Sequence, residues 1–261
     1  MKQSRLILTI AFILIVFNAY AIRPVKEYSR TPDAIGISCE ELKVKTSDGY
    51  AINVWHYPVE ESTPIIIACS DAGNMSDWMT LAAYLQYNGM DVWTFDYRGF
   101  GDSDDFPIIR SQLFHTEFVK DLSAVVDYVC DKTSEIPMLM GISMGSIIVN
   151  EYLKNNERKI VNLIYDGYVC NPSVWIGRLK EKGKEVSLPK GYDATTYDNK
   201  GCHILYIIAE KDTFSLMSDI PHQDSADTRI KSFDCEHIMS FFKFPKEYIK
   251  ELITFIDSYD D

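Results

Sequence analysis

A serine enclosed by two glycines is the residue of this sequence best placed for covalent chemistry. It lies in Gly141-Ile142-Ser143-Met144-Gly145, between an apolar run over residues 136–142 that predicts a strand and a run with helical spacing over residues 147–153. A G-x-S-x-G turn between strand and helix is a nucleophile elbow, which presents the serine hydroxyl at the edge of a sheet. The helix N-terminus beside it favours developing negative charge. Ser143 is therefore the candidate nucleophile.

A serine hydroxyl is a poor nucleophile unless a neighbouring base takes its proton. The chain has five histidines, and His237 follows the last expected strand in Cys235-Glu236-His237. His222 lies in the loop after Asp212 and is the competing candidate. We expect His237 to be the general base.

A carboxylate should complete the group by holding the imidazole in the correct tautomer. Asp212 comes shortly after the expected strand at residues 204–208, and the order Ser143, Asp212, His237 is the chain order of nucleophile-elbow enzymes. Asp166, at the end of the preceding expected strand, is the alternative acid. An oxyanion hole further needs two backbone N–H groups. Met144, directly after the nucleophile, would supply one, and the loop over residues 70–74 the other.

These residues need a sheet that brings distant loops to one edge. Alternation over residues 41–57 predicts an antiparallel hairpin. A continuous apolar run then predicts a strand buried on both faces at residues 65–69. Further strands are expected at residues 91–95, 136–142, 161–165, 204–208 and 230–233. Helical patterns separate them, beginning at a Ser76 cap and at residues 114–130, 147–153 and 248–256. The pattern predicts an α/β fold with a mostly parallel central sheet, an antiparallel N-terminal hairpin and helices on both faces. Residues 170–200 can hold one or two short helices, too few for a large cap domain.

The elbow, the ordered acid and base, and the segment Phe95-Asp96-Tyr97-Arg98-Gly99-Phe100-Gly101-Asp102-Ser103 together resemble the α/β-hydrolase superfamily over about residues 40–259. Most specifically, the chain looks like the cap-poor serine hydrolases related to serine aminopeptidases and acyl esterases. The resemblance implies that the Asp71 backbone N–H is the second oxyanion donor. It also shows a departure, because Cys69-Ser70 stands where the family usually has His-Gly. An inward-facing Asp71 carboxylate would depress catalysis or recognise a cationic substrate group.

Composition limits the partners. Lys and Arg number 26 against 38 Asp and Glu, a net charge of −12, and no basic cluster offsets it. Such a surface repels phosphate backbones, so we expect no nucleic-acid binding.

No P-loop, HExxH or complete dinucleotide fingerprint occurs, so we expect neither a metal nor another cofactor. Four acidic residues lie in loops at the edge that carries Ser143, which favours neutral or cationic acyl substrates: Asp71, Asp96, Asp102 and Asp104.

The first residues have the pattern of a secretory signal peptide. Two basic residues lie within residues 1–5, an uncharged apolar run covers residues 6–17, and Ala19-Tyr20-Ala21 follows. We expect cleavage after Ala21, export to the periplasm or the extracellular space, and a single domain over residues 22–261. The alternative is an uncleaved anchor through residues 1–21, which would be the only membrane contact.

Export permits disulfides, but the six cysteines contain no CxxC pair. Four of them lie in or beside apolar runs and are expected to be buried thiols: Cys69, Cys130, Cys170 and Cys202. A disulfide involving Cys39, Cys202 or Cys235 stays open.

The leading hypothesis is an exported serine hydrolase that cleaves an ester, thioester or amide, with esters favoured. The alternatives are a non-catalytic binding protein of the same fold and an acyltransferase that uses the same three residues.

Overall fold

A computed structural model describes residues 21–155, 158–193, 201–223 and 225–258 of the chain. The expected leader, residues 1–20, lies outside the described residues, and Ala21 is the first residue within them. In the described ranges, no helix has both the length and the apolar character needed to cross a membrane.

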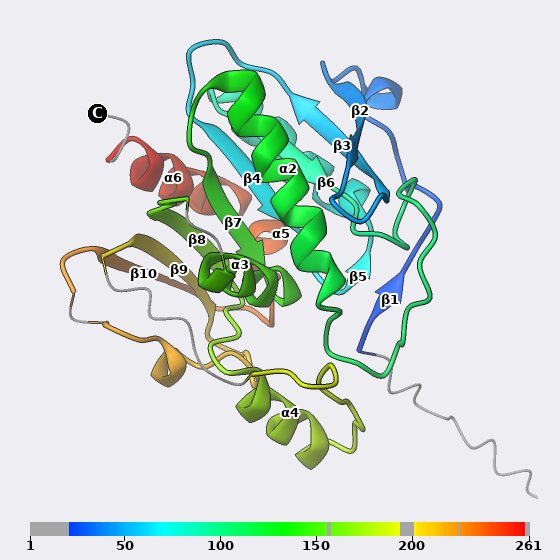
Figure 1. Cartoon of the computed structure of the whole chain (residues 1–261). Coiled ribbons are helices and arrows are strands. Elements are labelled where there is room, and N and C mark those ends of the chain that lie inside the picture. The colour runs from blue at the N-terminus through cyan, green and yellow to red at the C-terminus, as the bar shows by residue number, and fades with distance from the viewer. Residues whose placement is uncertain (1–20, 156–157, 194–200, 224, 259–261) are drawn as a thin grey trace, which may run out of the picture.

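An eight-stranded sheet forms the centre of the molecule, with the order β10-β9-β8-β7-β4-β6-β3-β2 (Figure 1). Its strands are β2 (Glu40–Lys45), β3 (Ala51–Tyr57), β4 (Pro64–Ala68), β6 (Asp91–Phe95), β7 (Met138–Ile142), β8 (Asn162–Asp166), β9 (His203–Ala209) and β10 (Thr228–Phe233). The β2–β3 and β3–β6 pairs are antiparallel, and every other pair of neighbours is parallel. The predicted α/β architecture with its N-terminal hairpin is confirmed.

Helices cover both faces of the sheet, which explains why its central strands are apolar throughout. In β4, Ile65 and Ile67 pack into the cluster that contains residues of α1 (Met79–Tyr87) and α6 (Pro245–Ile256). Ile66 and Ala68 point the other way, into the cluster with α2 (Glu117–Thr133) and α3 (Met144–Asn155). Successive strand residues face opposite sides of a sheet, so a strand covered on both sides needs a continuous apolar run.

Two local features differ from expectation. Asn74, not Ser76, is the N-cap that opens this region: its side chain accepts from the Ser76 N–H at 3.0 Å and begins a 3-10 helix, Met75–Trp78, that leads into α1. The structure also contains a second, two-stranded sheet of β1 (Arg23–Pro24) and β5 (Ala72–Gly73), which no sequence pattern predicted.

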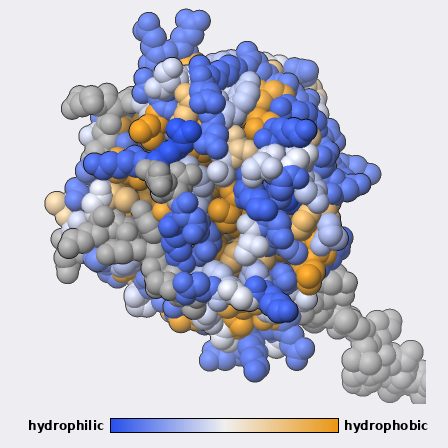
Figure 2. All heavy atoms as spheres, in the orientation of Figure 1, coloured by the Kyte–Doolittle hydropathy of each residue, from blue (hydrophilic) through white to orange (hydrophobic). Residues whose placement is uncertain are grey.

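The remaining helices are short. The irregular stretch after β8 holds α4 (Pro172–Glu181), and α5 (Ser240–Lys243) precedes α6. Within the described residues of that stretch there is no large cap domain, as expected. Figure 2 shows polar and charged side chains over most of the visible face, with small apolar patches between them.

No disulfide joins any of the six cysteines, all of which lie in the described ranges. Cys69 and Cys202 are buried as expected, whereas Cys130 and Cys170 are only half-buried. Cys235 is also fully buried, although the sequence left it as a disulfide candidate.

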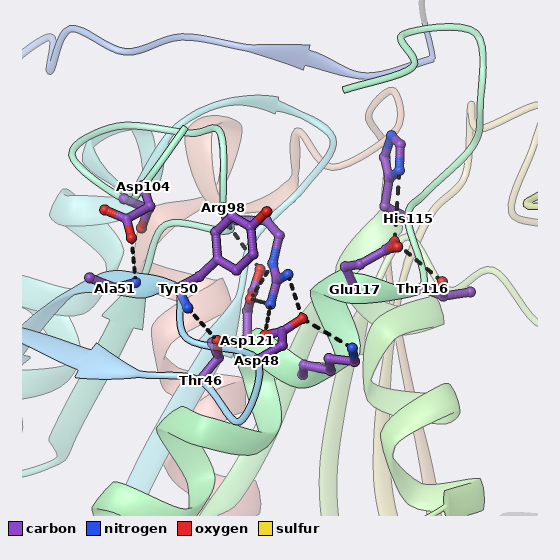
Figure 3. Close-up of polar contacts among 12 residues, drawn as sticks. Thr46, Asp48, Tyr50, Ala51, Arg98, Asp104, His115, Thr116, Glu117 and Asp121 are labelled. Carbon is purple, nitrogen blue, oxygen red and sulfur yellow. Dashed lines mark hydrogen bonds and ion pairs between the residues drawn. The ribbon is translucent and has the colours of Figure 1, made fainter. Parts of the chain in front are cut away.

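A buried arginine fastens the N-terminal hairpin to the rest of the fold (Figure 3). The Arg98 side chain is fully buried, and its Nε donates to Asp121 Oδ1 of α2 at 2.8 Å. Its two terminal nitrogens each lie 3.0 Å from a carboxylate oxygen of Asp48, in the turn between β2 and β3. The guanidinium carbon lies 4.1 Å from the centre of the Tyr50 ring. This contact with Arg98 holds the pKa of Asp48 well below its usual range.

Candidate active site

Ser143 occupies a strained turn between β7 and α3. Its φ is +51°, a conformation that a non-glycine residue adopts only where the surroundings impose it. Its backbone N–H donates to the Asp166 carbonyl at 2.8 Å, and its own carbonyl accepts from the Ser146 N–H at 2.9 Å. Gly145 allows the turn to approach β4, because a Cβ there would lie 1.9 Å from the Ala68 carbonyl oxygen. The geometry is that of the predicted elbow.

The structure brings together the three side chains that the sequence singled out. His237 Nε2 lies 2.8 Å from Ser143 Oγ, and His237 Nδ1 lies 2.5 Å from Asp212 Oδ2. The serine follows β7, the aspartate follows β9 and the histidine follows β10, so three strand ends converge at one edge. Asp212 Oδ1 also accepts from the Phe214 N–H at 2.8 Å. Burial raises the pKa of Asp212, but the hydrogen bonds from His237 and this loop outweigh it and hold the pKa below its ordinary value.

The side chains of the two alternative residues do not join this hydrogen-bonded series. Asp166, at the end of β8, accepts from Tyr248 Oη at 2.9 Å through Oδ2, while its Oδ1 has no partner. Burial raises the pKa of Asp166 to about 7. His222 lines a different pocket, together with Cys202 and Tyr206.

A glycine that the sequence analysis left aside packs directly against His237. Gly167 has φ +65°, and a Cβ there would lie 2.6 Å from His237 Cε1. The dipeptide Asp166-Gly167 is typical of an ordinary turn. Gly167 matters because His237, 70 residues later in the sequence, packs against it, so no local sequence pattern could have identified it.

The two expected oxyanion donors belong to the start of α3 and to the loop after β4. Met144 is the first residue of α3, so its N–H has no acceptor within the helix. Asp71 occupies the bend after β4, and its carbonyl accepts from the Arg23 N–H at 2.8 Å. Burial raises the pKa of the Asp71 carboxyl, against the opposing effects of its own backbone N–H and of the Arg23, His237 and Lys184 charges. The carboxylate of Asp71 therefore lies within electrostatic reach of the imidazole.

The other three acidic residues of this edge have different surroundings. Asp96 is buried between Tyr28 Oη at 2.6 Å and the Met75 N–H at 2.7 Å. Burial raises the pKa of Asp96 to about 6. Asp104 accepts from the Ala51 N–H at 2.8 Å, and Asp102 is exposed.

Two aromatic side chains flank the imidazole on the side of α4. The ring of Trp175 lies 5.6 Å from His237 and that of Phe214 lies 6.4 Å from it, centre to centre. The Trp175 indole Nε1 is buried and has no hydrogen-bond partner. Tyr192, later in the same irregular stretch, packs on Phe114 instead. Phe214 was missed because an isolated aromatic residue after Asp212 carries no pattern.

The described residues contain no group of three or more His, Cys, Asp or Glu side chains arranged to hold a metal ion. The chemistry available at this edge is that of the hydrogen-bonded serine, imidazole and carboxylate, with the N-terminus of α3 directly after the serine.

Comparison with known families gives one match that covers half of the chain. The model of the serine aminopeptidase family, S33, matches residues 62–201. A protein of Salmonella typhi, YfhR, is 29% identical over 140 residues, which make up 50% of this chain and 44% of that protein. Sterol esterase 2 of Saccharomyces cerevisiae is 28% identical over 192 residues, 62% of this chain and 36% of the esterase. The matched region thus spans less than half the length of these relatives.

Solved structures share the fold over nearly the whole chain. An esterase of Pyrococcus furiosus, Pf2001, superposes with a TM-score of 0.75 and 17% identity, covering 92% of this chain and 98% of the esterase. An esterase of Exiguobacterium antarcticum gives a TM-score of 0.62 with 18% identity, covering 84% of this chain and all of that protein (100%). At these identities the likeness concerns the fold.

Proposed function

This chain belongs to the serine aminopeptidase family of α/β-hydrolases, and on that premise we propose that it is a serine hydrolase acting through an acyl-enzyme on Ser143. One observation carries the proposal: the continuous contact from Ser143 Oγ to His237 Nε2, 2.8 Å, and from His237 Nδ1 to Asp212 Oδ2, 2.5 Å. These are the distances at which a base can take the proton of a nucleophile while a carboxylate orients the base.

The reaction follows from this arrangement. Ser143 Oγ bonds to the substrate carbonyl carbon while its proton passes to His237 Nε2. The carbonyl oxygen becomes an oxyanion, which the Met144 and Asp71 N–H groups would bind. The leaving group departs with the proton from Nε2 and leaves an acyl-serine. Water then attacks the acyl carbon and gives a proton to Nε2, and Nε2 passes this proton to Ser143 Oγ as the acid is released.

The substrate class follows from the surroundings of His237. The similarity to sterol esterase 2 and to esterase structures favours an ester over a peptide bond. Trp175 and Phe214 offer apolar surface beside the imidazole. The Asp71 carboxylate disfavours an anionic group close to the scissile bond, so neutral or cationic acyl compounds are the proposed substrates.

We further propose that the protein is exported, because residues 1–21 have the pattern of a secretory signal peptide.

A fluorophosphonate probe tests the proposal, because it reacts with activated serines. The wild-type protein should be labelled and Ser143→Ala should not. Ser173→Ala, which removes an exposed serine of α4, is the matched control and should label like the wild type. Equal labelling of Ser143→Ala would overturn the assignment.

Turnover assays separate the remaining alternatives. A folded protein that neither labels nor hydrolyses short p-nitrophenyl esters and aminoacyl amides would instead be a binding protein of this fold. Labelling with product formed mainly on an added amine or alcohol acceptor would identify an acyltransferase.

A further inference from the structure

The first described residues of the chain run across the edge that carries the proposed active site. Residues 22–28, which we call the strap, contain β1, and β1 pairs in parallel with β5 in the loop after β4 (Figure 1). The Arg23 N–H donates to the Asp71 carbonyl at 2.8 Å, and the Val25 N–H donates to the Gly73 carbonyl at 3.0 Å. Two backbone hydrogen bonds therefore join the strap to the loop that contains Asp71.

The strap is anchored at both ends. The Ile22 side chain is fully buried in the main apolar cluster, and its N–H donates to the Arg110 carbonyl at 3.1 Å. At the other end, Tyr28 Oη donates to Asp96 Oδ2 at 2.6 Å, and its ring lies 4.6 Å from that of Trp55. A segment held in this way has a fixed position and can fix what it contacts.

A third connection comes from the loop itself. The Asn74 side-chain amide donates to the carbonyls of Val25 and Glu27 at 3.1 and 2.9 Å. Asp96, which accepts from Tyr28, also accepts from the Met75 N–H at 2.7 Å. The loop from Asp71 to Met75 is thus tied to the strap, directly or through Asp96, at each end and in the middle.

These contacts determine the orientation of peptide groups beside the expected oxyanion donor. Each peptide group is planar, so the hydrogen bond to the Asp71 carbonyl orients the whole Asp71–Ala72 peptide group. The bond to the Gly73 carbonyl orients the Gly73–Asn74 peptide group in the same way. The Asp71 N–H belongs to the Ser70–Asp71 peptide group, which directly precedes the first of these. We infer that the strap is a positioning element of the active site, which holds the loop so that the Asp71 N–H points at the oxyanion of the proposed reaction.

The expected effect is on the chemical step. Oxyanion donors act by being in place before charge develops, and loss of one such donor costs about 10²–10³ in kcat. A displacement of about 1 Å can cost about 10²-fold. Because the strap acts through the loop and touches no substrate, its loss should lower kcat while leaving KM nearly unchanged.

Val25 allows a direct test, since the residue is 46% exposed and joins the loop through backbone groups alone: its N–H donates to Gly73 and its carbonyl accepts from Asn74. Val25→Pro removes that N–H, whereas Val25→Ala keeps it and serves as the matched control. The full-length variants are compared on a p-nitrophenyl ester that the wild type hydrolyses. We expect kcat of Val25→Pro to be about ten- to a hundredfold below that of Val25→Ala, with KM within threefold. Affinity for a boronic acid, which mimics the tetrahedral intermediate, should fall by the same factor as kcat.

Several results would overturn the inference. Equal kcat in Val25→Pro and Val25→Ala would show that the strap does not position the loop. An increase in KM alone would mean that it shapes substrate binding instead. If Val25→Pro has lost its near-ultraviolet circular dichroism, Tyr28→Phe takes its place: it removes the bond to Asp96 and keeps the ring on Trp55. Unchanged kcat and boronic-acid affinity in Tyr28→Phe would then reject the inference.

The inference rests on the proposed function, and the two can fail separately. If the wild-type protein shows neither labelling nor turnover, both the proposed function and this inference are rejected. If the wild type is active but the strap variants keep its kcat, only this inference is rejected.

Discussion

Gly167 lies against the imidazole of His237, so closely that any side chain there would collide with the ring. A Cβ at this position would lie 2.6 Å from His237 Cε1 and 3.1 Å from Nδ1. The glycine therefore determines where the imidazole can sit between Ser143 and Asp212. It does so from the turn after β8, far from His237 in the sequence.

Gly167→Ala should consequently damage catalysis more than folding. The methyl group forces His237 away from its contact with Ser143, and we expect kcat/KM to fall at least about a hundredfold. The left-handed backbone at this position adds a cost of about 1–2 kcal/mol to folding once a Cβ is present. Ester hydrolysis and urea unfolding measure the two effects. Gly183→Ala, at another glycine with positive φ but open space around it, is the control for backbone strain and should keep full activity.

The Asp71 carboxylate should determine the charge preference of the site. At an effective dielectric constant of about 20, charges about 10 Å apart interact by between about 1 and 2 kcal/mol, or about tenfold in rate. We expect Asp71→Asn to raise kcat/KM for a neutral ester, because a negative charge beside the oxyanion is lost. It should lower the preference for an ester with an ammonium group in its acyl chain by about tenfold.

A matched pair of p-nitrophenyl esters, neutral and cationic, measures this ratio. Asp102→Asn removes an exposed carboxylate from the same edge and should leave the ratio within about twofold. An Asp71→Asn variant with the wild-type ratio would show that this carboxylate does not act on the substrate.

Some features of the sheet edge that carries Ser143 were predictable from the sequence, and others were not. The place of Ser143 on a tight turn was predictable because the elbow needs a local pattern, and the convergence of Asp212 and His237 on it because each follows an expected strand of one parallel sheet. The pairing of β1 with β5 was not, since two-residue strands have no periodicity and the pairing is made by backbone groups that every residue has. Gly167 and Phe214 escaped for a related reason. Their importance comes from contacts with His237 that only the folded chain creates.

Arg98 should be a major source of stability. It is fully buried between Asp121 and Asp48, so Arg98→Met leaves the Asp121 carboxylate buried without its partner. Breaking a buried pair in this way costs about 3–5 kcal/mol. Adding Asp121→Asn should recover part of the loss, because no uncompensated charge remains. Urea unfolding measures each free energy, and Arg158→Met, which breaks an exposed pair with Asp127, should cost less than about 1 kcal/mol. Equal losses in the two methionine variants would contradict this view of Arg98.

Asp166 should make the protein less stable as the pH rises. Its pKa is raised to about 7, chiefly by burial and further by the Asp212 charge, against the lowering effects of Tyr248 and His237. The folded protein therefore keeps a proton that the unfolded chain releases near pH 4. The stability from this proton is fully present below about pH 4 and is lost as the pH rises through about 7.

Asp166→Asn keeps an acceptor for Tyr248 Oη and does not titrate. The free energy of unfolding of this variant minus that of the wild type should therefore increase by a few kcal/mol from pH 4.5 to pH 8. Urea unfolding at both pH values tests this, with Asp127→Asn as the exposed control. A constant difference between Asp166→Asn and the wild type would mean that Asp166 is ionised throughout, and that the pocket around its unpartnered Oδ1 tolerates a charge.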